Sequence, residues 1–193
     1  MAPLSATGGA AATASGRARL ATVWLGGCSG CHMSLLDLDE RLLDLAPRIE
    51  LVYSPLVDAK VFPDDVAITL VEGAVCNEDH LELAGRIRAR SRLVVALGDC
   101  AVSGNVSALR NPLGGALAVL ERAYCDPAGL RPQRPEAPGL LPRLLDRVLP
   151  LHQAIPVDAW LPGCPPSADL IHAVLVDLLE GRQPSLQGKL RYG

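Results

Sequence analysis

The stretch Leu25-Gly26-Gly27-Cys28-Ser29-Gly30-Cys31 decides the fold, because it joins two segments of different character. Residues 21–26 form a continuous apolar run typical of a buried parallel strand. The leucines of residues 35–45 have helical spacing, with Ser34 as the expected N-cap and Pro47 beyond the end. The stretch is therefore a tight loop between a strand and a helix. Its glycines let the backbone approach a bulky inorganic group, and its two cysteines can bind one metal centre.

The alternation of strands and helices continues along the chain. Further strands are expected at 49–53, 66–71, 93–97 and 155–161, and helices at 78–90, 106–109, 116–123, 140–149 and 168–180. Asn77 and Ser167 are the expected N-caps of the two strongest helices. The proline-rich residues 126–143 are expected to form an irregular loop, either a linker or a segment that contacts a partner. The order predicts an α/β fold with an open, mostly parallel sheet.

Four cysteines each follow the end of an expected strand. Cys28 and Cys31 follow the first strand, Cys100 follows the fourth and Cys164 follows the last. The carboxyl ends of parallel strands share one edge of a sheet, so we expect the four thiols to meet there. Four thiolates suit zinc or an iron–sulfur cluster. One close pair with two distant single cysteines favours the cluster, while zinc and a redox-active dithiol at the close pair stay open as alternatives.

Further polar residues lie near this edge. Glu72 follows the third strand, where it can relay protons or contact a partner; the alternative is a solvated loop acid. His32 is interpreted either as a hydrogen-bond donor to the metal centre or partner contact, or as a surface or capping residue. Cys76 and Cys125 are interpreted as small apolar residues, with a redox or ligand role left open for Cys76.

Composition limits the classes of function. The chain has 193 residues, of which 49% are hydrophobic and only 3% aromatic, so the core must be largely aliphatic. Residues 21–193 are expected to form a single domain, with Trp24 and Trp160 packed in its core. The net charge is −3 and the sequence has no basic tract. These properties favour neither a nucleic-acid-binding protein nor a membrane-surface protein.

The first 20 residues are expected to be a disordered N-terminal tail, with a transit peptide as the alternative. They are rich in Ala, Gly, Ser and Thr, and they have neither the apolar region of a secretory signal nor a twin-arginine pair. Without an export signal, the protein is expected to be in a reducing compartment. In such a compartment cysteines serve metals or catalysis more often than disulfides.

Taken together, the motifs resemble the small subunit of nickel–iron hydrogenases. The resemblance covers roughly residues 22–180 and rests on Gly27-Cys28-Ser29-Gly30-Cys31, Glu72-Gly73, Gly98-Asp99-Cys100 and Pro162-Gly163-Cys164-Pro165-Pro166. The last motif also resembles the related quinone-reductase (complex I) subunit. That relative has adjacent cysteines where this chain has two residues between Cys28 and Cys31, and the difference favours the hydrogenase branch.

The resemblance implies a flavodoxin-like domain with helices on both faces of the sheet. It implies that Cys28, Cys31, Cys100 and Cys164 bind one proximal [4Fe–4S] cluster at the carboxyl edge of the strands. It also places Glu72 near that cluster and the subunit interface. The nickel–iron site would belong to a separate large subunit.

The short stretch after the last helix narrows the resemblance to the cytoplasmic NAD-reducing hydrogenase, because relatives with a second domain carry further clusters. Electrons would then pass to diaphorase subunits that carry flavin (FMN) and iron–sulfur clusters and reduce NAD. Another cytoplasmic [NiFe] hydrogenase and a complex I-type subunit remain alternatives within the resemblance. The residues alone also leave open a zinc-stabilised binding module and a flavodoxin-like flavoprotein, although the first loop is not a clear phosphate-binding loop.

Overall fold

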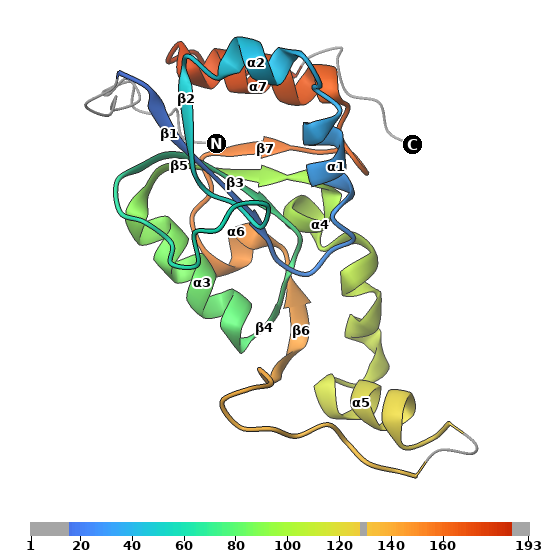
Figure 1. Ribbon diagram of the computed structural model, residues 1–193. Coiled ribbons are helices and arrows are strands. Elements are labelled where there is room, and N and C mark those ends of the chain that lie inside the picture. Colours follow the sequence, from blue (N-terminus) through green and yellow to red (C-terminus); the bar gives the residue numbers. More distant parts are fainter. Residues whose placement is uncertain (1–15, 128–130, 187–193) are drawn as a thin grey trace.

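A five-stranded parallel sheet forms the centre of the protein in the computed structural model, which describes residues 16–127 and 131–186 (Figure 1). The strand order is β2-β1-β3-β5-β7, and every neighbouring pair is parallel. These strands are β1 (Ala18–Trp24), β2 (Ile49–Tyr53), β3 (Val66–Glu72), β5 (Ser91–Leu97) and β7 (Ala159–Leu161). Counted within the sheet, this order is 2-1-3-4-5, as in flavodoxin-like folds, so the prediction of the fold class is confirmed.

Helices cover both faces of the sheet (Figure 1). One face packs against α1 (Gly30–Leu36), α2 (Arg41–Leu45) and α7 (Ala168–Leu179), and the other against α3 (Glu78–Arg90), α4 (Gly98–Ser103) and α6 (Leu151–Ala154). Successive strand residues point to opposite faces. Val95 and Leu97 accordingly belong to the first layer, whereas Val94 and Ala96 belong to the second. Both layers are largely aliphatic, as the composition predicts, with Phe62 as a buried aromatic residue of the second layer.

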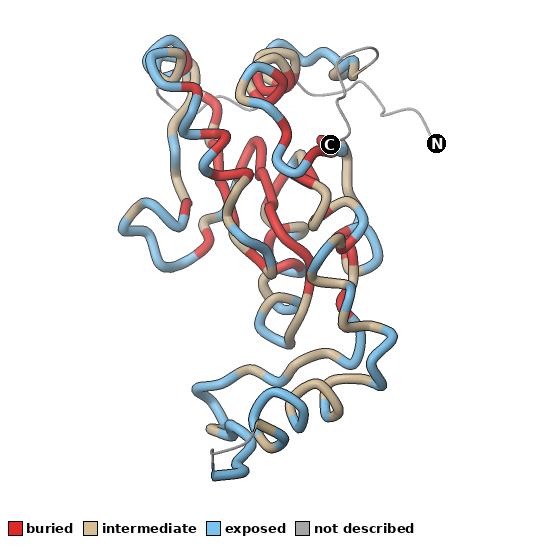
Figure 2. Tube along the Cα trace, turned by 90° about the vertical axis from the view of Figure 1, so that its right-hand side faces the viewer, coloured by how far each residue is buried: buried red, intermediate tan, exposed pale blue. Residues whose placement is uncertain are grey.

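An arm extends from this body at one end (Figure 1). It consists of the 3₁₀ helix η1 (Asn105–Leu113), α5 (Ala116–Tyr124), residues 131–143, and β6 (Leu144–Leu149), which pairs antiparallel with β4 (Val75–Asn77). The Asn111 side chain donates to Val148 O at 3.0 Å and accepts from Val148 N at 2.7 Å. Buried residues concentrate in the sheet and its helices, whereas the arm is mostly exposed or half-buried (Figure 2).

The predicted helix at 140–149 is wrong. Residues 144–149 form β6, and β4 was not expected at all. The spacing of the leucines and Val148 in this segment is compatible with a helix and with a strand. Pro150 would end either element. Tertiary pairing with β4 and η1 decides the outcome, and a local pattern does not contain that information. The last strand of the sheet is also shorter than predicted: β7 begins only at Ala159, because Pro156 interrupts the predicted strand at 155–161.

Two boundaries near the N-terminus also differ from the prediction. Residues 18–20 belong to β1 rather than to a disordered tail, since Ala18 pairs with Ile49 of β2 and Leu20 is buried; residues 1–15 of the expected tail lie outside the described residues. The expected helix at 35–45 is two helices, separated where Asp39 has a φ of 48°. The first of these helices begins at Gly30, so Ser34 is inside the helix and is not its cap.

Several local predictions are confirmed and one is wrong. β2 and α3 have the predicted bounds, and Asn77 and Ser167 cap α3 and α7 by accepting from His80 N and Leu170 N. Trp160 is 43% exposed, so it is not a core residue. Among residues 16–127 and 131–186, no helix combines the length and apolarity that crossing a membrane requires.

We predict that Leu175→Ala lowers the free energy of unfolding by about 2–5 kcal/mol, because it leaves a cavity in the core between α7 and the sheet. Leu175 is 1% exposed. Leu43→Ala is the matched control, since Leu43 is 74% exposed and should change stability by less than about 0.5 kcal/mol. Urea unfolding of both variants measures the difference, and equal midpoints would contradict the assignment of Leu175 to the core.

Candidate functional site

Three loops bring the four predicted cysteines to the carboxyl edge of the sheet. Cys28 lies in the loop after β1, and Cys31 lies in the first turn of α1. Cys100 lies in α4, directly after β5, and Cys164 follows β7. The site adjoins the carboxyl ends of the neighbouring strands β1 and β3, between which the strand order reverses. In open α/β sheets this switch point is the usual place for a bound group.

Glycines allow the loops to approach each other closely. A Cβ atom at Gly98 would lie 2.2 Å from Cys31 Sγ, and Gly98 has a φ of +80°, so no larger residue fits there. A Cβ atom at Gly27 would contact Gly73 Cα at 3.4 Å, and it would lie 4.0 Å from Cys100 Cβ. The Cys28 loop therefore lies directly beside the residues that carry Cys31 and Cys100.

Backbone hydrogen bonds join the loops in pairs. Gly26 and Ala74 exchange two bonds of 2.9 Å, which join the loops after β1 and β3. Asp99 N donates to Gly163 O at 2.9 Å, and Gly163 N donates to Asp99 Oδ1 at 2.7 Å, which joins the loops after β5 and β7. The Ser34 hydroxyl of α1 donates to Pro166 O at 2.5 Å, so α1 is tied to the Cys164 loop as well.

The four thiols differ in exposure. Cys31 is buried, Cys100 is half-buried, and Cys28 and Cys164 are exposed. Burial raises the pKa of the Cys31 thiol well above its usual range, and the nearby Glu72, Cys100, Cys28 and Cys164 raise it further. Burial also raises the pKa of Cys100, with Cys164, Cys28 and Glu72 acting in the same direction. Each thiolate thus disfavours ionisation of the other thiols. A positively charged centre is needed to keep all four ionised together.

Glu72 is a buried carboxylate at the base of the site. It is 3% exposed, and its oxygens accept from Cys31 N at 3.3 Å and from His32 N at 3.0 Å. His32 Nδ1 also hydrogen-bonds Glu72 Oε2. The interpretation of Glu72 as a solvated loop acid is therefore wrong. The carboxylate fixes the first turn of α1, which carries Cys31, to the end of β3.

His32 is completely buried, so the interpretation of this residue as a surface or capping histidine is wrong. Its ring packs edge-to-face on Trp24, with centroids 5.1 Å apart. Its Nε2 atom is buried without a hydrogen-bond partner among the described residues. Sequence reasoning missed this arrangement because it began the helix after Ser34, which placed His32 in a loop.

Asn105 is a second residue that sequence reasoning missed. Its side-chain Nδ2 donates to Cys164 Sγ at 3.5 Å. Burial raises the pKa of Cys100, and a hydrogen bond from Asn105 opposes that rise. The available signal was the dipeptide Gly104-Asn105 directly after α4, which is typical of a tight turn.

Cys76 and Cys125 do not join the four thiols. Cys76 is half-buried behind the Gly26 backbone, with its thiol 3.4 Å from Ala74 O, and burial raises its pKa. Cys125 caps the end of α5 on the arm. Among residues 16–127 and 131–186, no three His, Cys, Asp or Glu side chains gather closely enough to hold a single metal ion.

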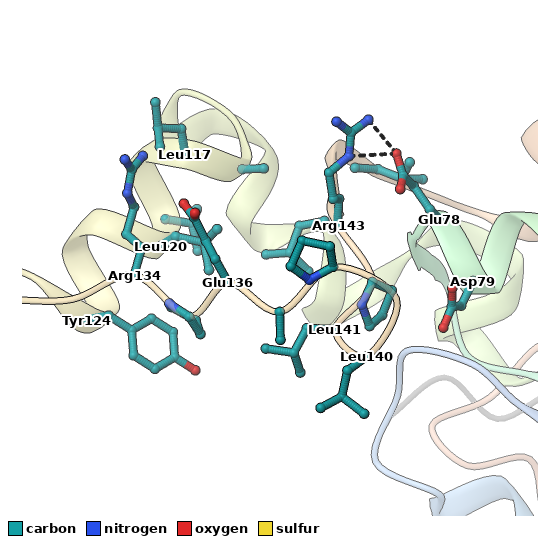
Figure 3. Close-up of a pocket in the computed structure, with 18 of the residues that line it drawn as sticks. Glu78, Asp79, Leu117, Leu120, Tyr124, Arg134, Glu136, Leu140, Leu141 and Arg143 are labelled. Carbon is teal, nitrogen blue, oxygen red and sulfur yellow. Dashed lines mark hydrogen bonds and ion pairs between the residues drawn. The ribbon is translucent and has the colours of Figure 1, made fainter.

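A large cavity lies on the arm, and none of the four predicted cysteine ligands lines it (Figure 3). Its volume is about 1230 Å³, and no cysteine lines it. Leu117, Leu120 and Tyr124 of α5 face residues 134–146 across it, and Arg143 pairs with Glu78 at its rim at 2.6 Å. This cavity contains none of the predicted site residues.

Residues 28–178 match the family described as NADH ubiquinone oxidoreductase, 20 Kd subunit. This chain belongs to that family. The match extends from the first predicted cysteine nearly to the end of α7, and it therefore includes all three cysteine loops.

Individual relatives of this chain are hydrogenase subunits. The chain is 40% identical over 178 residues to the delta subunit of the NAD-reducing hydrogenase HoxS of Cupriavidus necator, covering 89% of this chain and 83% of that one. It is 38% identical to a subunit of the F420-non-reducing hydrogenase vhu of Methanococcus voltae, covering 90% of this chain but only 60% of the relative. The chain thus spans less than two thirds of the length of this methanogen protein.

A solved structure of a hydrogenase is also similar to this chain. The chain matches the crystal structure of an NAD+-reducing [NiFe]-hydrogenase in the H2-reduced state with a TM-score of 0.87 and 41% identity, covering 92% of this chain and 99% of the other. The resemblance to nickel–iron hydrogenase small subunits is confirmed. Of these three relatives, the two with the higher identity come from NAD-reducing hydrogenases, which favours the NAD-linked branch over the alternatives.

We predict that Glu72→Ala lowers the free energy of unfolding by about 1–3 kcal/mol, because it leaves the donors Cys31 N, His32 N and His32 Nδ1 buried without their acceptor. Glu72→Gln keeps the shape and one carbonyl acceptor, so it should cost less. Glu136→Ala, at an exposed position, is the control. Urea unfolding compares the variants, and equal stability of Glu72→Ala and Glu136→Ala would show that the carboxylate does not hold α1.

Proposed function

We propose that this chain is the electron-transfer small subunit of an NAD-reducing [NiFe] hydrogenase. The observation that supports this most directly is the convergence of Cys28, Cys31, Cys100 and Cys164 from three loops at the switch point of the sheet. The identity of about 40% to NAD-reducing hydrogenase subunits, over nearly the whole described chain, supports the same function.

The four cysteines fit a single [4Fe–4S] cluster. A Cβ atom would lie 2.2 Å from Cys31 Sγ at Gly98 and 3.3 Å from Cys28 Sγ at Gly30, so these two glycines let the backbone lie close to the sulfurs. A cluster of several iron atoms spans a wider gap between thiolates than one ion does, in keeping with thiols that approach without forming a mononuclear metal site. When bound, the cluster would take up and release one electron at a time. We assign Cys28, Cys31, Cys100 and Cys164 as its ligands.

The protein's own groups set the conditions for this transfer. Burial of Cys31 keeps water from the inner side of the site, and the buried Glu72 carboxylate places negative charge beside it. Burial and the carboxylate each disfavour the additional negative charge that reduction would place on the cluster. Both therefore lower its reduction potential. Cys28 and Cys164 are exposed, and Met33, two residues after Cys31 in α1, is 47% exposed, so the outer side of the site can meet a partner subunit.

The solved relative is a hydrogenase that reduces NAD+, which implies a large subunit as a partner of this chain. We propose that this large subunit carries the nickel–iron site and that diaphorase subunits with FMN and iron–sulfur clusters receive the electrons and reduce NAD. A cytoplasmic location and a partner-contacting role for residues 126–143 stay predictions. A proton-relay role for Glu72 also stays a prediction, and slower hydrogen turnover in Glu72→Gln with an unchanged cluster would support it.

We predict that Cys100→Ser loses or alters the four-iron signal and abolishes NAD-linked hydrogen oxidation, because one of the four thiolates is removed. Iron and acid-labile sulfide counts, together with the electron paramagnetic resonance (EPR) spectrum of the anaerobically purified complex, measure the first effect. Cys125→Ser is the matched control, since Cys125 lies on the arm and should leave both properties unchanged.

Two results would contradict this function. Cys100→Ser with full iron content and full activity would remove Cys100 from the site. One zinc and no iron in the wild-type protein would favour the zinc-stabilised module instead.

A further inference from the structure

Asn105 reaches the outer side of the cysteine site with its side-chain amide. The Nδ2 group donates to Cys164 Sγ at 3.5 Å, within hydrogen-bond range for a sulfur acceptor. The amide therefore links the start of η1 to the Cys164 loop, which follows β7.

The backbone turns sharply to put the amide there. Gly104 has a φ of 87° and Asn105 a φ of 38°, so two successive residues are left-handed directly after α4. Gly104 N donates to Cys100 O at 2.9 Å, and Ala108 N donates to Gly104 O at 3.0 Å, which fixes this reversal. Asparagine tolerates left-handed backbone better than most residues do. Backbone conformation alone could therefore explain this residue, and a test must separate the two explanations.

We propose that Asn105 is a positioning residue that raises the reduction potential of the cluster by donating an N–H···S hydrogen bond to its outer thiolate. This inference rests on the function proposed above. Reduction adds negative charge to the sulfurs, and a donor aimed at sulfur stabilises that charge. The buried Glu72 carboxylate acts in the opposite sense on the inner side, next to Cys31. The two groups would set the potential between them.

Asn105→Gly and Asn105→Asp separate the two explanations, since both residues tolerate a positive φ. Asn105→Gly removes the donor without backbone strain, and Asn105→Asp replaces the donor with a negatively charged acceptor. We expect Asn105→Gly to weaken reduction about 3- to 10-fold, as for a typical hydrogen bond. At 59 mV per tenfold change for one electron, this is a shift of about 30–60 mV to more negative potential. Asn105→Asp should shift the potential further in the same direction.

The measurement is an EPR-monitored redox titration of the anaerobically purified complex, with iron and sulfide counted for each variant. Ser103→Ala is the matched control, because the Ser103 hydroxyl donates to the backbone oxygen of Asp99 and not to a thiol, so its loss should not shift the potential. An unshifted potential in both Asn105 variants would overturn the proposal. Loss of iron in Asn105→Gly would also overturn it, because the residue would then hold the loop rather than tune the cluster. A wild-type complex without any four-iron signal would instead overturn the proposed function.

Discussion

The buried contact between Glu72 and the first turn of α1 is the interaction on which the site depends. A carboxylate at the end of β3 accepts from the backbone of Cys31 and His32, while the Cys31 thiol packs directly against Gly98. The contact joins three neighbouring strands of the sheet, since β1 leads into α1 and β5 leads into Gly98. An unpaired carboxylate would be costly at this depth, so its three donors and the turn they belong to stabilise each other.

Further hydrogen bonds join the remaining cysteine loops along the same edge of the sheet. The paired bonds between Asp99 and Gly163 hold the loop of Cys164 to that of Cys100, and the Ser34 hydroxyl ties α1 to the same loop. The sheet thus supplies the approximate positions of the cysteines, and a few short polar contacts fix their distances. Sites held on rigid elements by such supporting contacts keep their geometry better than sites on free loops.

Much of the fold follows from local pattern, whereas the closest contacts of the site do not. β3 and residues 93–97 of β5 are continuous apolar runs, and α3 and α7 have both an apolar stripe and a capping residue, so these elements could be predicted. β6 could not, because its pairing with β4 is long-range and its leucines suit either element. The four cysteines are visible as residues that follow strands. The positions of His32 and Asn105 depend on where α1 begins and how the chain reverses after α4, and neither is a property of a short window of sequence.

The unequal exposure of the four thiols gives the site an inner and an outer wall. Cys31 is enclosed by the protein, whereas Cys28 and Cys164 open outward. A metal centre at this place would be inserted from the open wall, and a partner subunit docked there would close the route behind it. Under the proposed function, iron would therefore have to be loaded before the subunits join. The same opening would leave a separated chain vulnerable to oxidants that the assembled complex keeps out.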